Sequence, residues 1–275
     1  MASPPGGSRF CATKREGRIR IAPEQPAPLQ SPAQSLSMPS PVAAILPDAS
    51  MVDFPGRLAA VLFLPGCPFR CGYCHNPELW NPNLPRLSWT DLDAACRRFR
   101  DNWTEAAVIT GGEPTLSPDL PDLVARLKRH GLAVKLDTNG SNPDLLASLL
   151  PSLDYVAMDI KCPPADYPLR TGFSDLPSLE RSIALVKTLG PRGEFRTTVL
   201  PAWHPPAAIQ TMAEWVHSLG DGTPATHWYL QPFRPLDTLP DPTFRTLPAP
   251  TSSALRALLP PLAPHVRHPS LRGDF

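Results

Sequence analysis

Short apolar runs recur along the chain from about residue 57 onward, and polar or turn-forming segments separate them. Each run is rich in Val, Ile, Leu, Ala or Phe, and each has the length of a strand rather than that of a buried helix. The pattern therefore predicts six β-strands, at residues 58–64, 106–110, 132–138, 154–160, 195–200 and 227–233.

Segments of helical period lie between the predicted strands. The segment that begins near Ser88 places Leu92, Cys96 and Phe99 on one face, and Ser117 is expected to be the N-cap of the next helix. Helices are therefore expected to begin near residues 88, 117, 142, 176 and 206.

Six strands that alternate with helices indicate an α/β protein with a parallel sheet and right-handed crossovers. Eight such units would close a full barrel, so six units favour an open, partial (β/α)6 barrel over residues 41–236. The active face of such a barrel lies at the carboxyl ends of its strands.

The two ends of the chain differ from the barrel in composition. Residues 1–40 are rich in Pro, Ser, Ala and Gln without an apolar period, so a disordered tail that includes Cys11 is expected. Residues 237–275 form a C-terminal extension with one short helix expected near residues 252–259. This extension is expected to pack across the open side of the barrel.

Charge and hydropathy argue against several classes of partner. The 275 residues carry a formal net charge of +1, which gives no reason to expect nucleic acid or an anionic membrane as a partner. No apolar run approaches the ~20 residues of a membrane span, and no secretory signal is recognisable. A cytoplasmic protein is expected, in which the six cysteines are not expected to form disulfides.

The stretch GCPFRCGYCHNPEL, residues 66–79, follows the first predicted strand. Its CGYCH segment has the form of a covalent haem attachment site, although such attachment usually takes place after export. Cys67, Cys71, Cys74 and His75 could instead bind zinc, or the three cysteines alone could bind an iron–sulfur cluster with one iron left open. The spacing by itself leaves these alternatives open.

Chemically suggestive residues also follow the next three strands. TGGEPT (110–115) follows the second strand, LDTNG (136–140) ends the third and MDIK (158–161) ends the fourth. The carboxyl ends of parallel strands meet at one edge of a sheet, so these segments are expected to share a site with the cysteine loop. The Gly-Gly pair leaves backbone groups approachable and Glu113 adds a carboxylate suited to an ammonium group, although GGEPT could also be only a turn.

Together these segments resemble the radical S-adenosylmethionine superfamily. Its signature C-x3-C-x2-C, with an aromatic residue before the last cysteine, matches Cys67, Cys71, Tyr73 and Cys74, and the resemblance extends over about residues 44–233. Within the superfamily the chain looks most like the glycyl-radical-enzyme activating proteins, in particular those of anaerobic ribonucleoside-triphosphate reductases. The segments that carry this likeness are SMVDFPGRLAAVLFLPGC, CHNPEL, GGEPT, DTNG, MDIK and LQPFRP.

The resemblance implies a 4Fe-4S cluster bound by Cys67, Cys71 and Cys74, with S-adenosyl-L-methionine chelating the open iron. It disfavours zinc, because a zinc site would not explain the motifs at the other strand ends. Cys96 and Cys162 are expected to be core residues, and the absence of a further cysteine cluster in the sequence argues against an auxiliary iron–sulfur centre.

Contacts to S-adenosylmethionine are implied by the same resemblance. The backbone around Tyr73 would face the adenine, and Lys161 would reach toward the carboxylate. The methionyl amino group would meet Gly111, Gly112 and Glu113.

Two further carboxylates and an arginine each have alternative roles. On the resemblance, Asp137 and Asp159 would share a monovalent cation, with Asp137 also among the cofactor-binding residues; both could instead cap helices or bind loop backbone. Arg196 could contact a substrate carboxylate or phosphate, or form a structural ion pair. Lys161 could also be a solvated lysine at a strand end.

The implied function is that of an activase. It would cleave S-adenosylmethionine reductively and generate a glycyl radical on a partner enzyme, expected to be an anaerobic ribonucleotide reductase. A flavodoxin or ferredoxin-type protein would supply the electron. The alternatives are a radical S-adenosylmethionine enzyme that acts on a small molecule, and a non-catalytic iron–sulfur or zinc module.

Overall fold

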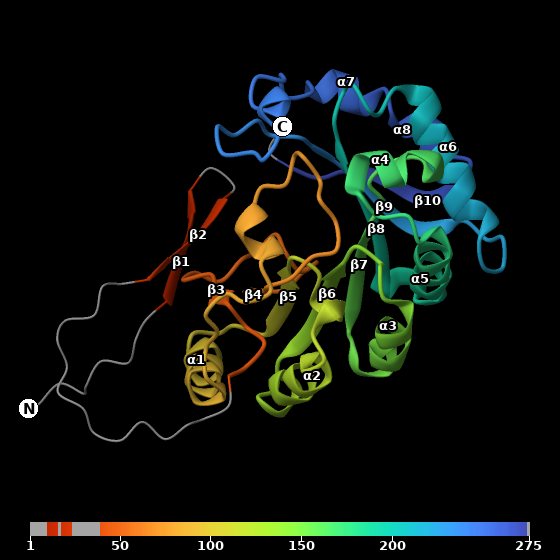
Figure 1. Cartoon of the computed structure of the whole chain (residues 1–275). Coiled ribbons are helices and arrows are strands. Elements are labelled where there is room, and N and C mark those ends of the chain that lie inside the picture. Colours follow the sequence, from red (N-terminus) through yellow and green to blue (C-terminus); the bar gives the residue numbers. More distant parts are fainter. Residues whose placement is uncertain (1–9, 16–17, 24–38, 274–275) are drawn as a thin grey trace, which may run out of the picture.

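The structure, a computed structural model, describes residues 10–15, 18–23 and 39–273 (Figure 1). Within these residues the main body is an eight-stranded sheet of strand order β10-β9-β8-β7-β6-β5-β4-β3. The strands from β4 to β10 are parallel to their neighbours, and β3 is antiparallel to β4. The strands are β3 (Ala44–Ile45), β4 (Ala59–Leu64), β5 (Ala106–Gly111), β6 (Ala133–Thr138), β7 (Tyr155–Asp159), β8 (Gly193–Val199), β9 (Ala225–Pro232) and β10 (Val266–Leu271).

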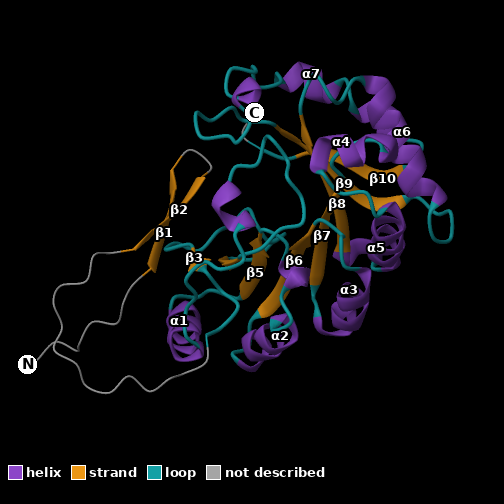
Figure 2. Cartoon of the chain, in the orientation of Figure 1, coloured by secondary structure: helices purple, strands orange, loops and turns teal. Residues whose placement is uncertain are grey.

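Helices pack on the outer face of this sheet (Figure 2). Ser88 and Asn142 cap α1 and α3, since their side chains accept hydrogen bonds from the backbone N–H groups three residues later. Ser117 was expected to cap α2, but that helix begins three residues later and has Asp119 at its cap position. The helices are α1 (Trp89–Asp101), α2 (Leu120–Arg129), α3 (Pro143–Leu149), α4 (Tyr167–Thr171), α5 (Leu176–Thr188), α6 (Pro206–Ser218), α7 (Ser252–Arg256) and α8 (Leu259–Leu262).

The two faces of the sheet bury different kinds of side chain. Between the sheet and the helices lies one large apolar core, whereas the apolar cluster of the inner face lies mainly beside β4 and β5, for example at Val61 and Val108. Beside β6 and β8 the inner face carries Lys135, Glu194 and Arg196 instead. Alternation along each strand separates the two sets. The charged half of the interior leads up to the carboxyl ends of the strands.

The partial (β/α)6 barrel is confirmed, because the six predicted strands correspond to β4 through β9. The C-terminal extension differs from expectation: it contains two short helices, α7 and α8, and the additional parallel strand β10 beside β9. Strand β10 lacks a clear apolar alternation because it contains Pro269 and basic residues. Proline is tolerated there because β10 is an edge strand. The extension also reaches the cysteine loop, where the Asp241 N–H donates to the Gly72 carbonyl oxygen at 3.1 Å.

Two strands lie in the described part of residues 1–40, the segment for which a disordered tail is expected. Strands β1 (Phe10–Arg15) and β2 (Arg18–Pro23) form an antiparallel pair, and β1 lies beside β3 (Figure 1). The overall composition of the segment is polar, although residues 18–21 alternate Arg-Ile-Arg-Ile with the period of a strand. Most of the remaining tail lies outside the described residues.

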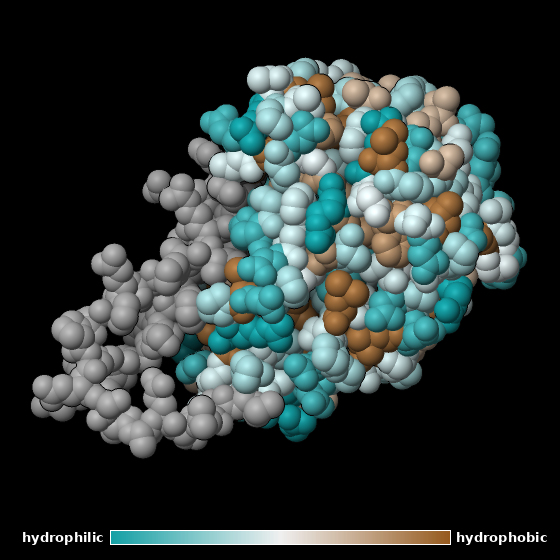
Figure 3. All heavy atoms as spheres, viewed as in Figure 1, coloured by the Kyte–Doolittle hydropathy of each residue, from teal (hydrophilic) through white to brown (hydrophobic). Residues whose placement is uncertain are grey.

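Hydrophobic residues are scattered among hydrophilic ones on the face shown in Figure 3. In the described part of the chain, no helix has both the length and the apolar character needed to cross a membrane.

Candidate functional site

The three cysteines of the 66–79 loop line one cavity at the carboxyl ends of the strands. The cavity has a volume of about 270 Å³, and Cys67, Cys71 and Cys74 face it from the loop between β4 and a 3-10 helix at Pro77–Trp80. Strands β5 to β9 and the residues that follow them supply the other side: Thr110, Gly111, Gly112, Asp137, Thr138, Asn139, Asp159, Lys161, Arg196, Thr198 and Gln231. The structure therefore brings together the four segments that the sequence predicted to share a site.

Hydrogen bonds within the chain fix the cysteine loop. The Gly66 N–H donates to the Leu79 carbonyl oxygen at 2.7 Å, which closes the loop at its base. Arg70 donates from one guanidinium nitrogen to the Cys67 carbonyl oxygen at 2.6 Å. The Cys74 N–H donates to the Cys71 carbonyl oxygen at 3.0 Å. These bonds fix the loop conformation through contacts within the chain.

Gly111 and Gly112 allow two backbone segments to approach each other closely. A Cβ atom on Gly112 would lie 2.2 Å from the Gly66 carbonyl oxygen, and one on Gly111 would lie 2.2 Å from the Leu64 carbonyl oxygen. The N–H groups of Gly112 and Glu113 donate to those same two oxygens, Leu64 and Gly66 respectively, at 2.9 and 2.7 Å. Both positions must therefore be glycine because β5 packs tightly against the base of the cysteine loop.

Among the described residues that line the cavity are Gly111 and Gly112 but not Glu113, whose expected contact with an ammonium group stays a prediction. Its side chain is fully buried, and its carboxylate accepts hydrogen bonds from the Thr115 N–H and hydroxyl, the Thr138 hydroxyl and the Asn139 N–H, at 2.5 to 3.1 Å. Burial raises the pKa of Glu113, and these hydrogen bonds oppose that shift. Glu113 therefore ties the end of β5 to the residues that follow β6.

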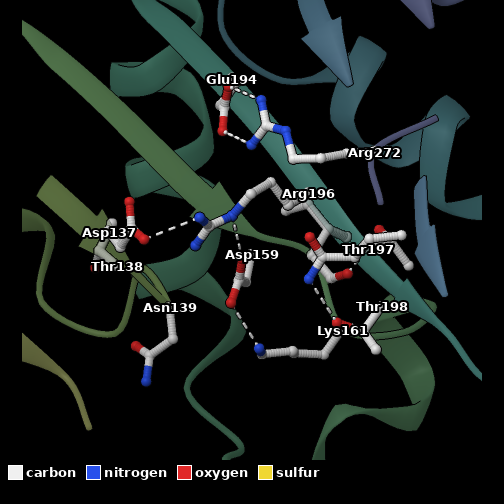
Figure 4. A network of polar contacts seen from close by, with 12 residues as sticks. Asp137, Thr138, Asn139, Asp159, Lys161, Glu194, Arg196, Thr197, Thr198 and Arg272 are labelled. Carbon is white, nitrogen blue, oxygen red and sulfur yellow. Dashed lines mark hydrogen bonds and ion pairs between the residues drawn. The ribbon is translucent and has the colours of Figure 1, made fainter. Parts of the chain in front are cut away.

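Asp137 and Asp159 are bridged by Arg196 (Figure 4). The Arg196 guanidinium donates to one oxygen of each carboxylate at 2.9 Å. Lys135 and Lys161 donate to the other oxygens of Asp137 and Asp159, at 2.6 and 2.8 Å. Each carboxylate has two cationic partners, and together these side chains form a ladder of buried ion pairs. The monovalent cation expected at Asp137 and Asp159 stays a prediction.

The charges of this ladder hold one another in their ionised forms. Burial alone would raise the pKa values of Asp137 and Asp159, but the adjacent Arg196 guanidinium keeps both below their usual range. Burial alone would lower the pKa of Lys161, and the Asp159 carboxylate raises it instead. Lys161 therefore presents a permanent positive charge to the cavity.

Two hydrogen bonds fix the backbone of Lys161, one at its N–H group and one at its carbonyl oxygen. The Lys161 N–H donates to the Tyr167 hydroxyl at 3.0 Å, and His204 Nε2 lies 2.9 Å from the Lys161 carbonyl oxygen. The other ring nitrogen of His204 accepts from the Leu200 N–H at 2.9 Å, so Nε2 carries the proton and donates. Burial lowers the pKa of His204 to about 4 and keeps its ring neutral.

The cavity fits a multinuclear cluster better than a single zinc ion. Three thiolates around one tetrahedral zinc ion would lie about 4 Å apart, because Zn–S bonds are about 2.3 Å long. Among the described residues, no three His, Cys, Asp or Glu side chains are grouped so as to hold one metal ion. In a cubane cluster each thiolate binds a different iron, so the three sulfur atoms stand further apart.

Other groups at the cavity agree with this conclusion. His75, which both zinc and haem would require, has its Nε2 at 3.0 Å from the Arg234 carbonyl oxygen. The buried Tyr73 hydroxyl lacks a hydrogen-bond partner within the described chain, which suits a cavity completed by a bound molecule. Burial raises the pKa of Cys67 to about 12 and that of Cys71 to about 11, so metal binding must displace their protons.

Several residues of the site were missed or left unassigned by sequence reasoning. Lys135, Asn139, Thr198, His204 and Gln231 were not assigned roles, although a lysine inside the apolar strand segment AVKLDT already indicates a buried ion pair. Cys96 and Cys162 are fully buried in the apolar core, as expected. Cys11 lies in β1, whose side chains are outside the described structure.

The fold and the site define a class: an α/β enzyme with a partial barrel and a three-cysteine cavity at the carboxyl ends of its strands. Residues 61–205 match the family described as the Radical SAM superfamily, and this chain belongs to that superfamily. Its members use a 4Fe-4S cluster together with S-adenosylmethionine, and these are the cofactors of the site.

Relatives in sequence extend the comparison. A Methanocaldococcus jannaschii protein, provisionally named a glycyl-radical enzyme activating enzyme, is 32% identical over 77% of this chain and 87% of its own length. The pyruvate formate-lyase-activating enzyme of Clostridium pasteurianum is 34% identical, and that of Streptococcus mutans is 36% identical. The matches to these two enzymes cover 40% and 45% of this chain and about half of theirs, 48% and 52%.

Solved structures share the fold. Streptococcus suis SuiB bound to its precursor peptide SuiA superimposes with a TM-score of 0.54 at 16% identity, over 80% of this chain and 49% of SuiB. SuiB bound to S-adenosylmethionine gives a TM-score of 0.51 at 15% identity, over 78% of this chain and 52% of SuiB. At such low identity these similarities concern the fold alone.

Proposed function

We propose that this chain is an activating enzyme that generates a glycyl radical on a partner enzyme, and that the partner is an anaerobic ribonucleotide reductase. The M. jannaschii relative supports the kind of partner, since most of its length aligns with this chain. The reductase is favoured by two segments, CHNPEL and LQPFRP, which lie in contact: the rings of His75 and Phe233 have centroids 6.5 Å apart, and His75 Nε2 lies 3.0 Å from the Arg234 carbonyl oxygen. These two segments carry the likeness to reductase activases, and their contact lies at the rim of the cavity.

In this proposal Cys67, Cys71 and Cys74 hold the cluster, and the Lys161 ammonium attracts the carboxylate of S-adenosylmethionine. When bound, the two cofactors supply a 5'-deoxyadenosyl radical that removes a hydrogen atom from a glycine Cα of the partner. The chain holds the reactants in place and excludes water. The segment around Gly111 and Gly112 forms one wall of the binding site, and its contact with Gly66 keeps that wall against the cysteine loop.

The partner loop would enter from the open side of the barrel. In the described part of the chain the sheet runs from β10 to β3 without closing on itself, so the inner face is not enclosed by strands on every side. A flavodoxin or ferredoxin-type protein in the cytoplasm would donate the electron.

The test mixes the reduced, cluster-loaded protein with S-adenosylmethionine and one candidate partner, either the anaerobic ribonucleotide reductase or the pyruvate formate-lyase of the same organism. The proposal predicts a glycyl radical doublet by electron paramagnetic resonance with the reductase. A doublet with the lyase alone would assign the other partner. No doublet with either, despite cleavage of S-adenosylmethionine, would refute glycyl radical activation of these two enzymes.

A further inference from the structure

Asn139 directs a hydrogen-bond donor at one of the three cysteine sulfur atoms. It directly follows β6, is only 6% exposed and lines the cavity beside the cysteine loop. Its side-chain Nδ2 lies 3.8 Å from the Cys67 Sγ, within range of a hydrogen bond to sulfur. The sequence predicted that the segment containing Asn139 shares a site with the cysteine loop, but it could not predict this particular hydrogen bond between residues 72 positions apart.

The orientation of the Asn139 amide is fixed by its own neighbours. Its Oδ1 accepts a hydrogen bond from the Ser141 N–H at 2.9 Å, so a rotated amide would turn an NH₂ group toward that donor. The Asn139 backbone N–H donates to the buried Glu113 carboxylate at 2.5 Å. Neither contact involves the cysteine loop. The donor is therefore aimed at Cys67 by bonds that do not depend on the sulfur atom.

A donor at this position affects the electron affinity of a bound cluster. Each electron added to a cluster increases the negative charge on its cysteine sulfur atoms. A hydrogen bond to one of them stabilises the reduced form more than the oxidised form, and so raises the reduction potential. Asn139 is buried and Cys67 is partly buried, and this low exposure to water strengthens the interaction.

We propose that Asn139 is a positioning residue that raises the reduction potential of the cluster through its hydrogen bond to Cys67, and that Glu113 supports it by anchoring its backbone. The inference rests on the cluster and not on the identity of the partner enzyme. A redox titration without any partner therefore tests it separately from the proposed function.

The experiment compares Asn139→Leu with Gln231→Leu in cluster-loaded protein without S-adenosylmethionine. Both changes remove an amide from the same cavity, but the Gln231 amide bonds to Thr198 and not to a cysteine. Midpoint potentials are measured by electron paramagnetic resonance at set potentials. Asn139→Leu should lower the equilibrium constant for one-electron reduction of the cluster about tenfold, which lowers the midpoint potential by about 59 mV. Gln231→Leu should leave the midpoint potential unchanged.

An unchanged midpoint in Asn139→Leu would overturn the proposal, and so would an equal fall in Gln231→Leu. If Leu at position 139 prevents cluster loading, Asn139→Ala and Gln231→Ala replace the pair, because they introduce no bulk. An unchanged midpoint potential in Asn139→Ala, or an equal fall in Gln231→Ala, would then overturn the proposal. A merely structural role for Asn139 would lower iron content or thermal stability without moving the potential of the clusters that do form.

Discussion

Gly112 shows how one residue type can serve a purpose different from the one its motif suggests. A glycine at a strand end is typical of a site where a ligand approaches the backbone. In this structure the space beside Gly112 is occupied by the Gly66 carbonyl oxygen, one residue before Cys67. The residue therefore shapes the cysteine loop as well as the cofactor cavity.

Gly112→Val is accordingly expected to lose most of the cluster, and not only affinity for S-adenosylmethionine. Its Cβ would overlap backbone atoms of Gly66 and Leu79, which cannot move without displacing the cysteine loop. Iron and sulfide content after anaerobic reconstitution measures this. Gly222→Ala is the control: a Cβ there would meet no atom within 4 Å, so the variant carries only the strain of a left-handed backbone at φ +68°, and it should load normally. A fully loaded Gly112→Val protein would contradict the expectation.

His204 links stability to pH because it is buried and neutral. Its pKa falls from 6.5 to about 4 on folding, so between these values the unfolded chain binds more protons than the folded one. The stability linked to His204 is fully present above pH 6.5 and is lost as the pH falls toward 4. At about pH 5 the loss should reach about 2 kcal/mol.

Replacing His204 by Gln should therefore reduce the difference in unfolding free energy between about pH 7.5 and about pH 5 by about 2 kcal/mol. Urea unfolding of the cluster-free protein measures this difference. Equal pH dependence in the wild type and His204→Gln would show that His204 does not carry this effect.

At the scale of elements, Arg196 ties three neighbouring strands together. It extends from β8 to Asp159 on β7 and Asp137 on β6, and the adjacent lysines complete the ladder. Removing one charge from such a buried network leaves its partners without compensation, which is more damaging than the loss of a surface ion pair.

Arg196→Met should destabilise the fold by about 3 kcal/mol or more, since two buried carboxylates each lose a partner. Arg181→Met is a matched control, because Arg181 pairs with Asp144 where both side chains are mostly exposed. That variant should change stability by less than about 1 kcal/mol. Chemical denaturation of both variants gives the comparison, and similar losses in the two would argue against a structural role for the ladder.

Most elements of the barrel could be predicted from sequence, because apolar runs and helix caps are local signals. The runs at 58–64 and 106–110 lie in β4 and β5, both buried on the two faces of the sheet. Strand β10 was missed because an edge strand is stabilised by pairing with β9 rather than by its own apolar pattern. Strands β1 and β2 were missed because their alternation is short and lies in a proline-rich segment.

At the scale of the whole molecule, the barrel gathers residues from six successive strands and the loops after them around one cavity. The sequence predicted this meeting because the carboxyl ends of parallel strands share one edge of the sheet. It also predicted the cysteines, whose spacing is a local signal. It could not predict which polar groups bond to each other. Glu113 and Thr138, for example, are 25 positions apart, and only the packing of β5 beside β6 brings them together.

The central claim is that Cys67, Cys71 and Cys74 bind a cluster that cleaves S-adenosylmethionine. The most direct test incubates anaerobically reconstituted protein with dithionite and S-adenosylmethionine, then quantifies 5'-deoxyadenosine by chromatography. The wild type and Cys162→Ser, which alters a fully buried core thiol, should both form 5'-deoxyadenosine, and Cys74→Ser should form none. Absence of the product from fully loaded wild-type protein, or equal yield from Cys74→Ser, would contradict the claim.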